Sequence, residues 1–378
     1  MPSLDNNTKA FLTLVRAGLW EKEARLSPFG KVDYDEVIRL AEEQSVIGLV
    51  AAGIEKLTDS REKGFTIPLE TKLQFVGQAL QIEQRNTEMN RFVSEMVERM
   101  REKGIYTLLV KGQGIAQCYE KPLWRMCGDV DLLLSDDNYE KAKEFLQPFA
   151  RTIETESVGG KHLGMTIEQW VVELHGNLHC GLSARMDRSI DKVQENVFYG
   201  GNVRSWMNGN TQVFLPSADN DVIFIFTHFL KHFYKGGLGL RQICDWCRLL
   251  WCYRSELNLR LLESRIRKMG LMSEWKAFGA FAVEVLGMPV EAMPMYDASN
   301  RWKRKAKRIL SFILMSGNMG HNRDNTFRSR PFLVRKTYSM CRRIGDVFNH
   351  AQIFPLDSLR FLPRLLLNGV RSAVNGVG

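Results

Sequence analysis

The change of pattern at Ile105 constrains the fold of this chain more than any other feature of its sequence. Up to Gly104, apolar residues recur at helical spacing, and a long helical pattern that begins near Leu73 ends at this glycine. Short β-rich runs follow as far as His175, and helical spacing returns after Pro216. The sequence therefore predicts an α+β fold, in which a small mixed β-sheet is flanked by N-terminal and C-terminal helical regions.

The same alternation suggests how the chain is divided. Its 378 residues exceed the usual size of a single compact core. We expect an N-terminal helical region over 1–104, an α/β core over 105–215, and a C-terminal helical domain with a basic tail over 216–378. Within the α/β core we expect strands over 105–110, 130–134, 152–157, 162–167 and 170–175, with helices over 113–120 and 135–145.

Two aspartates stand at the start of the second predicted strand. Side chains two residues apart in a strand project to the same side, so Asp129 and Asp131 point together, about 6.6–7 Å apart along the chain. No basic residue is their obvious neighbour in the sequence, and a hard divalent cation would relieve their repulsion. Asp-x-Asp alone is a common pattern, but here it follows a strand and a Lys-Gly turn. It therefore predicts a site for Mg²⁺, or for Mn²⁺ in its place.

A third carboxylate stands in a later strand. Glu173 lies among apolar residues in Trp170–His175, where an uncompensated charge is costly, and His175 shares its face. A neighbouring strand that carries this carboxylate would permit a second metal about 3.5–4 Å from the first, which is the arrangement used for in-line phosphoryl transfer.

A second polar cluster follows Pro216. His228 and His232 stand four residues apart on one side of a predicted helix, with Lys231 between them, and Arg241 and Asp245 come next. A zinc site needs a further ligand, and no glutamate lies between the histidines as in a metalloprotease motif. Metal ligation, hydrogen bonding in the core and contact with a nucleotide remain open for this cluster.

Positive charge is concentrated near the C-terminus. Residues 301–378 contain 16 Lys/Arg and 3 Asp/Glu, whereas the rest of the chain contains 36 and 40. Such a region suits nucleic acid, anionic lipid or a phosphorylated substrate. In 301–313, however, apolar residues form one helical stripe, and this favours a solvated helix face over nucleic-acid contact.

The remaining composition suggests a cytoplasmic protein. The first 20 residues lack the features of a secretory signal, and no apolar run approaches the length of about 20 residues that a membrane span needs. Seven cysteines without framework spacing suit a reducing compartment. The sequence indicates no oligomeric state.

Three segments carry a resemblance to a known family. They are VKGQGIAQCYEKPLWRMCGDVDLLL, WVVELHGNLH and HFLKHFYKGGLGLRQICDW. Together they resemble a bacterial nucleotidyltransferase-like family often described as uncharacterised nucleotidyltransferase, a distant branch of the DNA polymerase beta superfamily. The resemblance extends over roughly residues 10–260. The sequence departs from the superfamily motif in two ways. Gly112 is followed by Gln113, where the superfamily has Ser or Gly. Asp129 lies 17 positions after Gly112, which is further than the superfamily spacing.

The resemblance implies roles for individual residues. Asp129, Asp131 and Glu173 are expected to bind the metal and to be catalytic. The nucleotide, ATP or another triphosphate, is expected to contact a set of glycine and basic residues: Lys111, Gly112, Arg125, Lys231, His232 and Arg241.

The expected activity is transfer of a nucleoside monophosphate from a nucleoside triphosphate to a hydroxyl group, with release of pyrophosphate. A sugar, a metabolite, a peptide and a protein side chain all remain open as acceptors. Two alternatives are a nucleic-acid-binding protein that uses the basic C-terminal region, and a nucleotide-binding protein that has lost catalysis.

Overall fold

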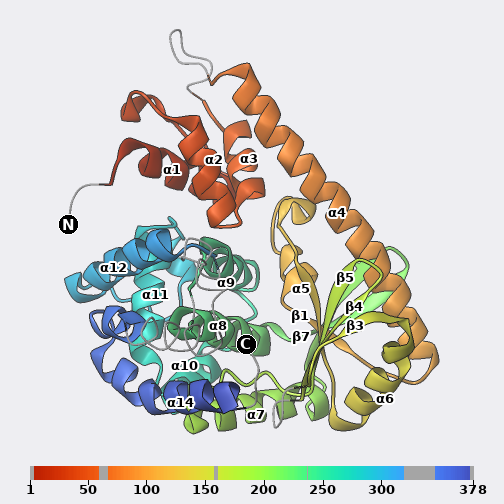
Figure 1. Cartoon of the computed structure of the whole chain (residues 1–378). Coiled ribbons are helices and arrows are strands. Elements are labelled where there is room, and N and C mark those ends of the chain that lie inside the picture. Colours follow the sequence, from red (N-terminus) through yellow and green to blue (C-terminus); the bar gives the residue numbers. More distant parts are fainter. Residues whose placement is uncertain (1–3, 59–66, 157–160, 236, 319–344, 375–378) are drawn as a thin grey trace.

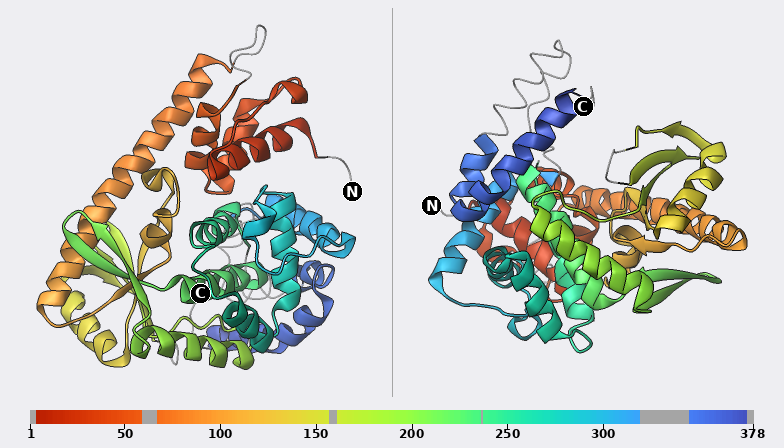
Figure 2. Two further views of the ribbon diagram at one scale, coloured as in Figure 1. Left: turned by 180° about the vertical axis from the view of Figure 1, so that it is seen from behind. Right: turned by 90° about the horizontal axis from the view of Figure 1, so that it is seen from below.

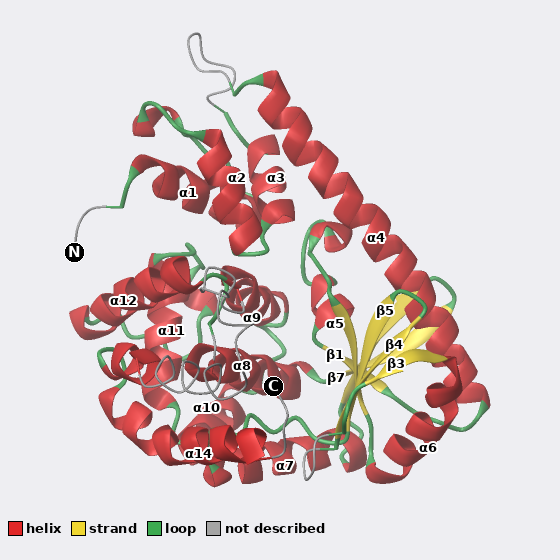
Figure 3. Cartoon of the chain, in the orientation of Figure 1, coloured by secondary structure: helices red, strands yellow, loops and turns green. Residues whose placement is uncertain are grey.

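The computed structural model is an α+β structure in which β-strands are confined to the middle of the chain (Figure 3). It describes residues 4–58, 67–156, 161–235, 237–318 and 345–374. A mixed five-stranded sheet and a separate two-stranded hairpin lie between helices that come before and after them in the sequence (Figure 1). The predicted fold class is confirmed.

The N-terminal part consists of three short helices and one long one. They are α1 (Asn6–Trp20), α2 (Tyr34–Glu43), α3 (Ile47–Glu55) and α4 (Leu69–Glu102). Helix α1 begins at Asp5, whose carboxylate accepts a hydrogen bond from the Thr8 amide at 2.8 Å. Helix α4 has 34 residues and runs from the first helices to the sheet (Figures 1 and 2).

The five-stranded sheet has the order β1-β2-β5-β4-β3. Its strands are β1 (Leu108–Val110), β2 (Asp129–Leu133), β3 (Ala150–Ile153), β4 (His162–Ile167) and β5 (Trp170–His175). Strands β2 and β5 are parallel, and the other three pairs are antiparallel. Two helices connect the first three strands: α5 (Gly112–Ala116) and α6 (Asp136–Leu146).

The two faces of the sheet differ in polarity because side chains alternate along each strand. Leu132, Val172 and Leu174 point to one face and belong to a core that also contains residues of α4 and α6. Asp131 and Glu173 occupy the alternate positions and therefore point to the opposite face. The sheet thus buries apolar side chains on one face and presents acidic groups on the other.

A helix and a hairpin follow the sheet, and neither was predicted. Helix α7 (Ala184–Tyr199) is capped by Ser183, and strands β6 (Val203–Asn208) and β7 (Thr211–Pro216) form an antiparallel pair. Only Gly209 and Asn210 lie between the paired residues Asn208 and Thr211. Apart from Pro216, these elements lie within the range 105–215 expected for the α/β core.

The C-terminal part is helical, as predicted. Its helices are α8 (Ala218–Lys235), α9 (Leu240–Cys252), α10 (Leu259–Met269), α11 (Met272–Glu284), α12 (Asn300–Ser316) and α14 (Pro355–Val374). Phe226, Phe229 and Trp246 are fully buried in its aromatic core, with Trp275 and Phe278. No helix in the described ranges is long and apolar enough to span a membrane.

Helix α12 shows how part of the basic C-terminal region is used. Trp302, Ala306 and Ile309 of its apolar stripe are buried, whereas Arg301 and Arg304 are exposed. The expected solvated helix face is therefore confirmed for α12. Residues 319–344 and 375–378 of the same basic region lie outside the described residues, so nucleic-acid binding by this region remains a prediction.

The first and last helical regions share one hydrophobic core. Residues of α1 and α3 belong to the same buried cluster as residues of α8, α9 and α11. The Trp20 indole N–H donates to the Leu286 carbonyl at 2.6 Å, and the Gln44 amide donates to the Ile313 carbonyl at 3.2 Å. The three-unit division of the chain remains a prediction, and this shared core, which also contains Val110 and Leu133 of the sheet, joins all three units.

Candidate active site

Parallel pairing of β2 and β5 brings the three predicted carboxylates together. Asp131 stands beside Glu173 in the register, and Asp129 precedes Asp131 by two residues on the same face. One carboxylate oxygen from each residue lies within 4.8 Å of the others. Asp131 is almost completely buried, whereas Asp129 and Glu173 are partly exposed. The acidic cluster therefore has a buried member and two members that solvent can reach.

Lys111 lies against this cluster, contrary to the expectation that the aspartates have no basic neighbour. It directly follows β1, whose Val110 pairs with Asp131 across the antiparallel β1–β2 ladder. The Lys111 ammonium donates to Asp131 Oδ1 at 2.7 Å, and His175 Nε2 lies 2.8 Å from the same oxygen. The repulsion within the cluster is thus partly offset by the protein itself, and both contacts use only one of the two Asp131 oxygens.

The turn at Lys111-Gly112 has an unusual backbone. Lys111 has φ +60° and Gly112 has φ +32°, both in the region that side chains with a Cβ disfavour. Such conformations cost free energy and are concentrated at functional sites. The turn places the Lys111 side chain on the acidic cluster, and contact between this turn and phosphate remains a prediction.

The surroundings shift the three carboxyl pKa values in different directions. Burial, with repulsion from Asp131, raises the pKa of Asp129. Burial alone would raise the pKa of Asp131, but attraction to Lys111 and the contact with His175 outweigh it and lower that pKa. Hydrogen bonds with His162 and His175 lower the pKa of Glu173 despite its burial. Asp131 and Glu173 are therefore held in the ionised form that a cation requires.

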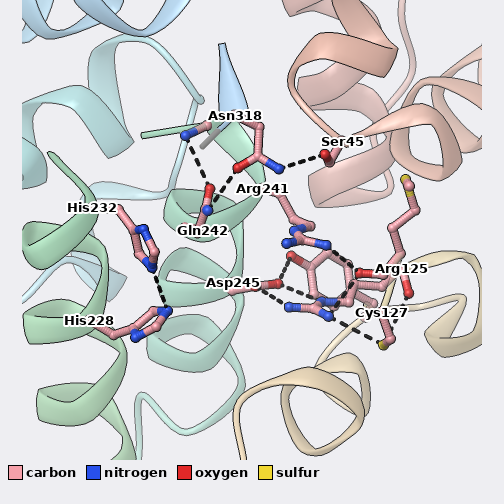
Figure 4. A network of polar contacts seen from close by, with 12 residues as sticks. Ser45, Arg125, Cys127, His228, His232, Arg241, Gln242, Asp245 and Asn318 are labelled. Atoms are coloured by element: carbon pink, nitrogen blue, oxygen red, sulfur yellow. Dashed lines mark hydrogen bonds and ion pairs between the residues drawn. The ribbon is translucent and has the colours of Figure 1, made fainter. Parts of the chain in front are cut away.

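Helix α8 contributes two neutral imidazoles and a lysine next to the cluster. His228 and His232 are linked through their Nε2 atoms at 3.0 Å (Figure 4). Burial lowers the pKa of His232 to about 3, with nearby Lys231 adding to this effect. Burial and repulsion from Lys111 lower the pKa of Lys231, which also lies within electrostatic range of Glu173. Lys231 makes no ion pair with the described part of the chain, so its ammonium is available to an anion.

Arg125, which the resemblance implies as a phosphate contact, is paired with a carboxylate of the protein. Its guanidinium is buried and makes two hydrogen bonds with the Asp245 carboxylate, at 3.1 and 2.5 Å (Figure 4). The Tyr119 hydroxyl donates to Asp245 Oδ1 at 2.8 Å. This network fixes α9 to the segment that enters β2, and a role for Arg125 in holding phosphate remains a prediction.

Arg241 lies close to Arg125 and retains an unused donor. One of its terminal nitrogens donates to the Met126 carbonyl at 2.9 Å (Figure 4). Its Nε is buried and has no hydrogen-bond partner among the residues that the structure describes. Burial and repulsion from Arg125 lower the pKa of Arg241, and Asp129 lies within electrostatic range. A buried donor without a partner is costly, so an anionic ligand would satisfy it.

His162 is the site residue that the sequence argument missed. It lies opposite His175 across β4 and β5, and its Nε2 is 3.2 Å from Glu173 Oε2. Both strands were predicted, and only Glu168 and Gln169 stand between Ile167 and Trp170. A two-residue turn fixes the register of a hairpin. Counting back from this turn would have placed His162 beside His175.

Comparison with protein families identifies a relationship for this chain. The family model described as "Uncharacterised nucleotidyltransferase" matches residues 30–287, which is more than half of the chain. Searches of curated proteins and of solved structures find no match. The matched range includes the whole mixed sheet, its three carboxylates and the α8–α9 pair. The chain therefore belongs to the uncharacterised nucleotidyltransferase family, whose members are transferases of phosphorus-containing groups.

Proposed function

We propose that the protein transfers a nucleoside monophosphate from a nucleoside triphosphate to a hydroxyl group, with Mg²⁺ or Mn²⁺ held by Asp129, Asp131 and Glu173. The observation that carries the proposal is the convergence of these three carboxylates within 4.8 Å on one face of the sheet. Oxygen ligands of this kind fit a hard divalent cation. The second oxygen of Asp131, which neither Lys111 nor His175 uses, supports this fit.

The cations around the cluster suit a polyphosphate. Lys231 lies within electrostatic range of Glu173 and Asp131, and Arg241 within range of Asp129, and neither makes an ion pair with the described residues. Lys111 adds a third positive group. In the proposal these side chains and the neutral His232 bind the triphosphate and balance the charge that develops on the departing pyrophosphate.

The proposed reaction forms one bond and breaks another at the α-phosphorus. The acceptor oxygen bonds to this phosphorus, the bond to the bridging oxygen of pyrophosphate breaks, and the hydroxyl proton leaves to solvent or to a carboxylate. The bound cation would stabilise the negative charge of the phosphates and the attacking oxygen. Asp131 or Glu173 lies nearest the acceptor hydroxyl, which belongs to a sugar, a metabolite, a peptide or a protein.

The test is label transfer by the purified protein. Each α-labelled triphosphate is incubated with Mg²⁺ or Mn²⁺ and a cell extract as the source of acceptor. We expect label in a product with the native protein and at least a 100-fold lower rate with Asp129→Asn, since one group that stabilises transition-state charge contributes about 10²–10³. Asp137→Asn, an exposed aspartate on α6, is the matched control.

Two outcomes would contradict the proposal. Equal label transfer by the native protein and Asp129→Asn would remove the carboxylates from catalysis. Binding of a triphosphate without transfer across a wide set of acceptors would instead support a nucleotide-binding protein that has lost catalysis.

A further inference from the structure

Two imidazoles converge on one carboxylate beside the acidic cluster. His162 and His175 lie directly opposite each other on β4 and β5, so their side chains share a face of the sheet. Glu173 precedes His175 by two residues and lies on that face as well. The ring centroids of the two histidines are 4.8 Å apart, and one ring nitrogen of each faces Glu173.

The distances between these atoms match those around a bound transition metal. Glu173 Oε2 lies 3.2 Å from His162 Nε2 and 3.3 Å from His175 Nε2. Neighbouring ligand atoms in a tetrahedral site stand about 3.3–3.6 Å apart when the metal–ligand bonds are about 2.0–2.2 Å. All three atoms lie within 4.8 Å of one another. The ligand cage is therefore already close to the size that an ion needs.

We propose that His162, Glu173 and His175 bind a divalent transition-metal ion such as Zn²⁺, Mn²⁺ or Fe²⁺, at a second site that is chemically distinct from the all-carboxylate one. Imidazole nitrogen suits these ions, whereas Mg²⁺ prefers oxygen. The inference extends the proposed function because Glu173 belongs to both ligand sets, but binding of the ion can be measured without nucleotide or acceptor.

The surroundings of the three ligands support an ion at this place. Asp131 Oδ1 lies 2.8 Å from His175 Nε2, so a fourth possible ligand atom, an oxygen, stands next to these three. His162 has 36% of its side chain exposed, which gives an ion a path from solvent. A carboxylate shared by two ions is the arrangement of two-metal sites, in which the ions are about 3.5–4 Å apart.

The test is titration of the metal-free protein with Co²⁺, whose visible absorption reports nitrogen ligands and coordination number. We expect one Co²⁺ to bind with a spectrum that excess Mg²⁺ does not remove. His162→Gln should lower the affinity by about 10–100-fold or more, since loss of even an outer-shell partner has that effect. His179→Gln is the matched control, because His179 pairs with Asp191 instead.

The outcomes separate this inference from the proposed function. A Co²⁺ spectrum and affinity unchanged in His162→Gln would show that the histidines only hydrogen-bond to Glu173, and the inference would be wrong. Asp129→Asn should abolish label transfer while it retains the Co²⁺ spectrum. Loss of transfer in Asp129→Asn together with unchanged Co²⁺ binding in His162→Gln would overturn the second site and leave the proposed function standing.

Discussion

Lys231 lies on α8 at the acidic face of the sheet, and no carboxylate of the described chain pairs with it. Its ammonium carries a cost of burial that a bound phosphate would offset. The same reasoning applies to the buried Nε of Arg241. Under the proposed function, both residues would gain a phosphate partner when the substrate binds.

Replacement of Lys231 by Gln should therefore weaken nucleotide binding. A hydrogen bond to a charged group contributes about 1.5–3 kcal/mol, so we expect KM for the triphosphate to rise roughly 10–100-fold, with a smaller change in kcat. Steady-state kinetics of label transfer measure both parameters. Lys192→Gln, an exposed lysine on α7, should leave KM unchanged. A fall in kcat at constant KM would place Lys231 in transition-state stabilisation instead.

Glu274 is a carboxylic acid that is fully buried on α11. Its Oε1 accepts a hydrogen bond from the Tyr234 hydroxyl at 3.0 Å. Burial, with the charge of Asp357, raises its pKa from 4.5 to about 8. Between these values the unfolded chain releases a proton that the folded chain retains, so the free energy of unfolding falls as pH rises from about 4.5 to 8.

Glu274→Gln removes this titration while it keeps the volume and an acceptor for Tyr234. We expect the variant to lose less stability than the native protein between pH 5 and pH 8, by about 1–4 kcal/mol. Urea unfolding at the two pH values gives the comparison. Parallel pH profiles for the two proteins would show that Glu274 ionises in the folded state with its ordinary pKa.

At the scale of elements, glycines set how closely α1 and α3 approach each other. A Cβ on Gly18 would stand 2.0 Å from the Leu49 carbonyl oxygen, and one on Gly53 would stand 2.1 Å from the Leu14 carbonyl oxygen. Both added Cβ atoms would collide with backbone atoms, which cannot rotate out of the way as a side chain can. The two helices therefore pack in direct backbone contact.

Gly18→Ala should separate these helices and destabilise the protein. Overpacking typically costs about 1–3 kcal/mol, which exceeds the gain in helix propensity. Gly77→Ala is the matched control on α4, where an added Cβ meets nothing within 4 Å and should stabilise the helix by up to about 1 kcal/mol. Thermal unfolding of both variants tests the pair. A higher melting temperature for Gly18→Ala would contradict the packing argument.

Comparison of the predicted and observed helices and strands shows what the sequence can and cannot predict. Strands β2, β4 and β5 were predicted because apolar residues gather in short β-rich runs, and Gly104 correctly marked the end of α4. Helix α7 was missed although Met186, Ile190 and Val193 recur at helical spacing. The β6–β7 hairpin was missed although its two turn residues, Gly209 and Asn210, are a turn signal.

Contacts between residues far apart in the sequence could not be predicted from local patterns. The contact between Lys111 and Asp131 depends on the β1–β2 register, and 18 residues separate these two strands in the sequence. The pairing of Arg125 with Asp245 joins segments 120 residues apart. Local patterns identify which residue types are available for chemistry, whereas partners this distant are determined only by tertiary packing.

At the scale of the whole molecule, one arginine links three distant segments. The Arg248 guanidinium on α9 donates to the Cys118 carbonyl at 2.6 Å, the Leu19 carbonyl at 2.7 Å and Glu21 Oε1 at 2.8 Å. Its side chain is 7% exposed. This residue therefore connects the end of α1, the segment after α5 and the C-terminal helices.

Arg248→Lys should destabilise the whole protein, because a single ammonium cannot reach all three acceptors and leaves a buried carbonyl without a donor. We expect a loss of about 2–4 kcal/mol in urea unfolding. Arg39→Lys is the matched control, since Arg39 is half-exposed and pairs with glutamates on its own helix, and it should cost less than about 1 kcal/mol. Equal losses in the two variants would argue against this linking role.

Helix α8 has two sides that the molecule uses differently. One side carries Phe226, Phe229 and Phe233 into the aromatic core, and the other carries His228 and Lys231 over the acidic face of the sheet. The packing of the buried rings therefore positions the partly buried Lys231. Exchanging one of these phenylalanines should therefore move Lys231, the residue of this helix face that we propose to contact the triphosphate, although the ring itself lies in the core.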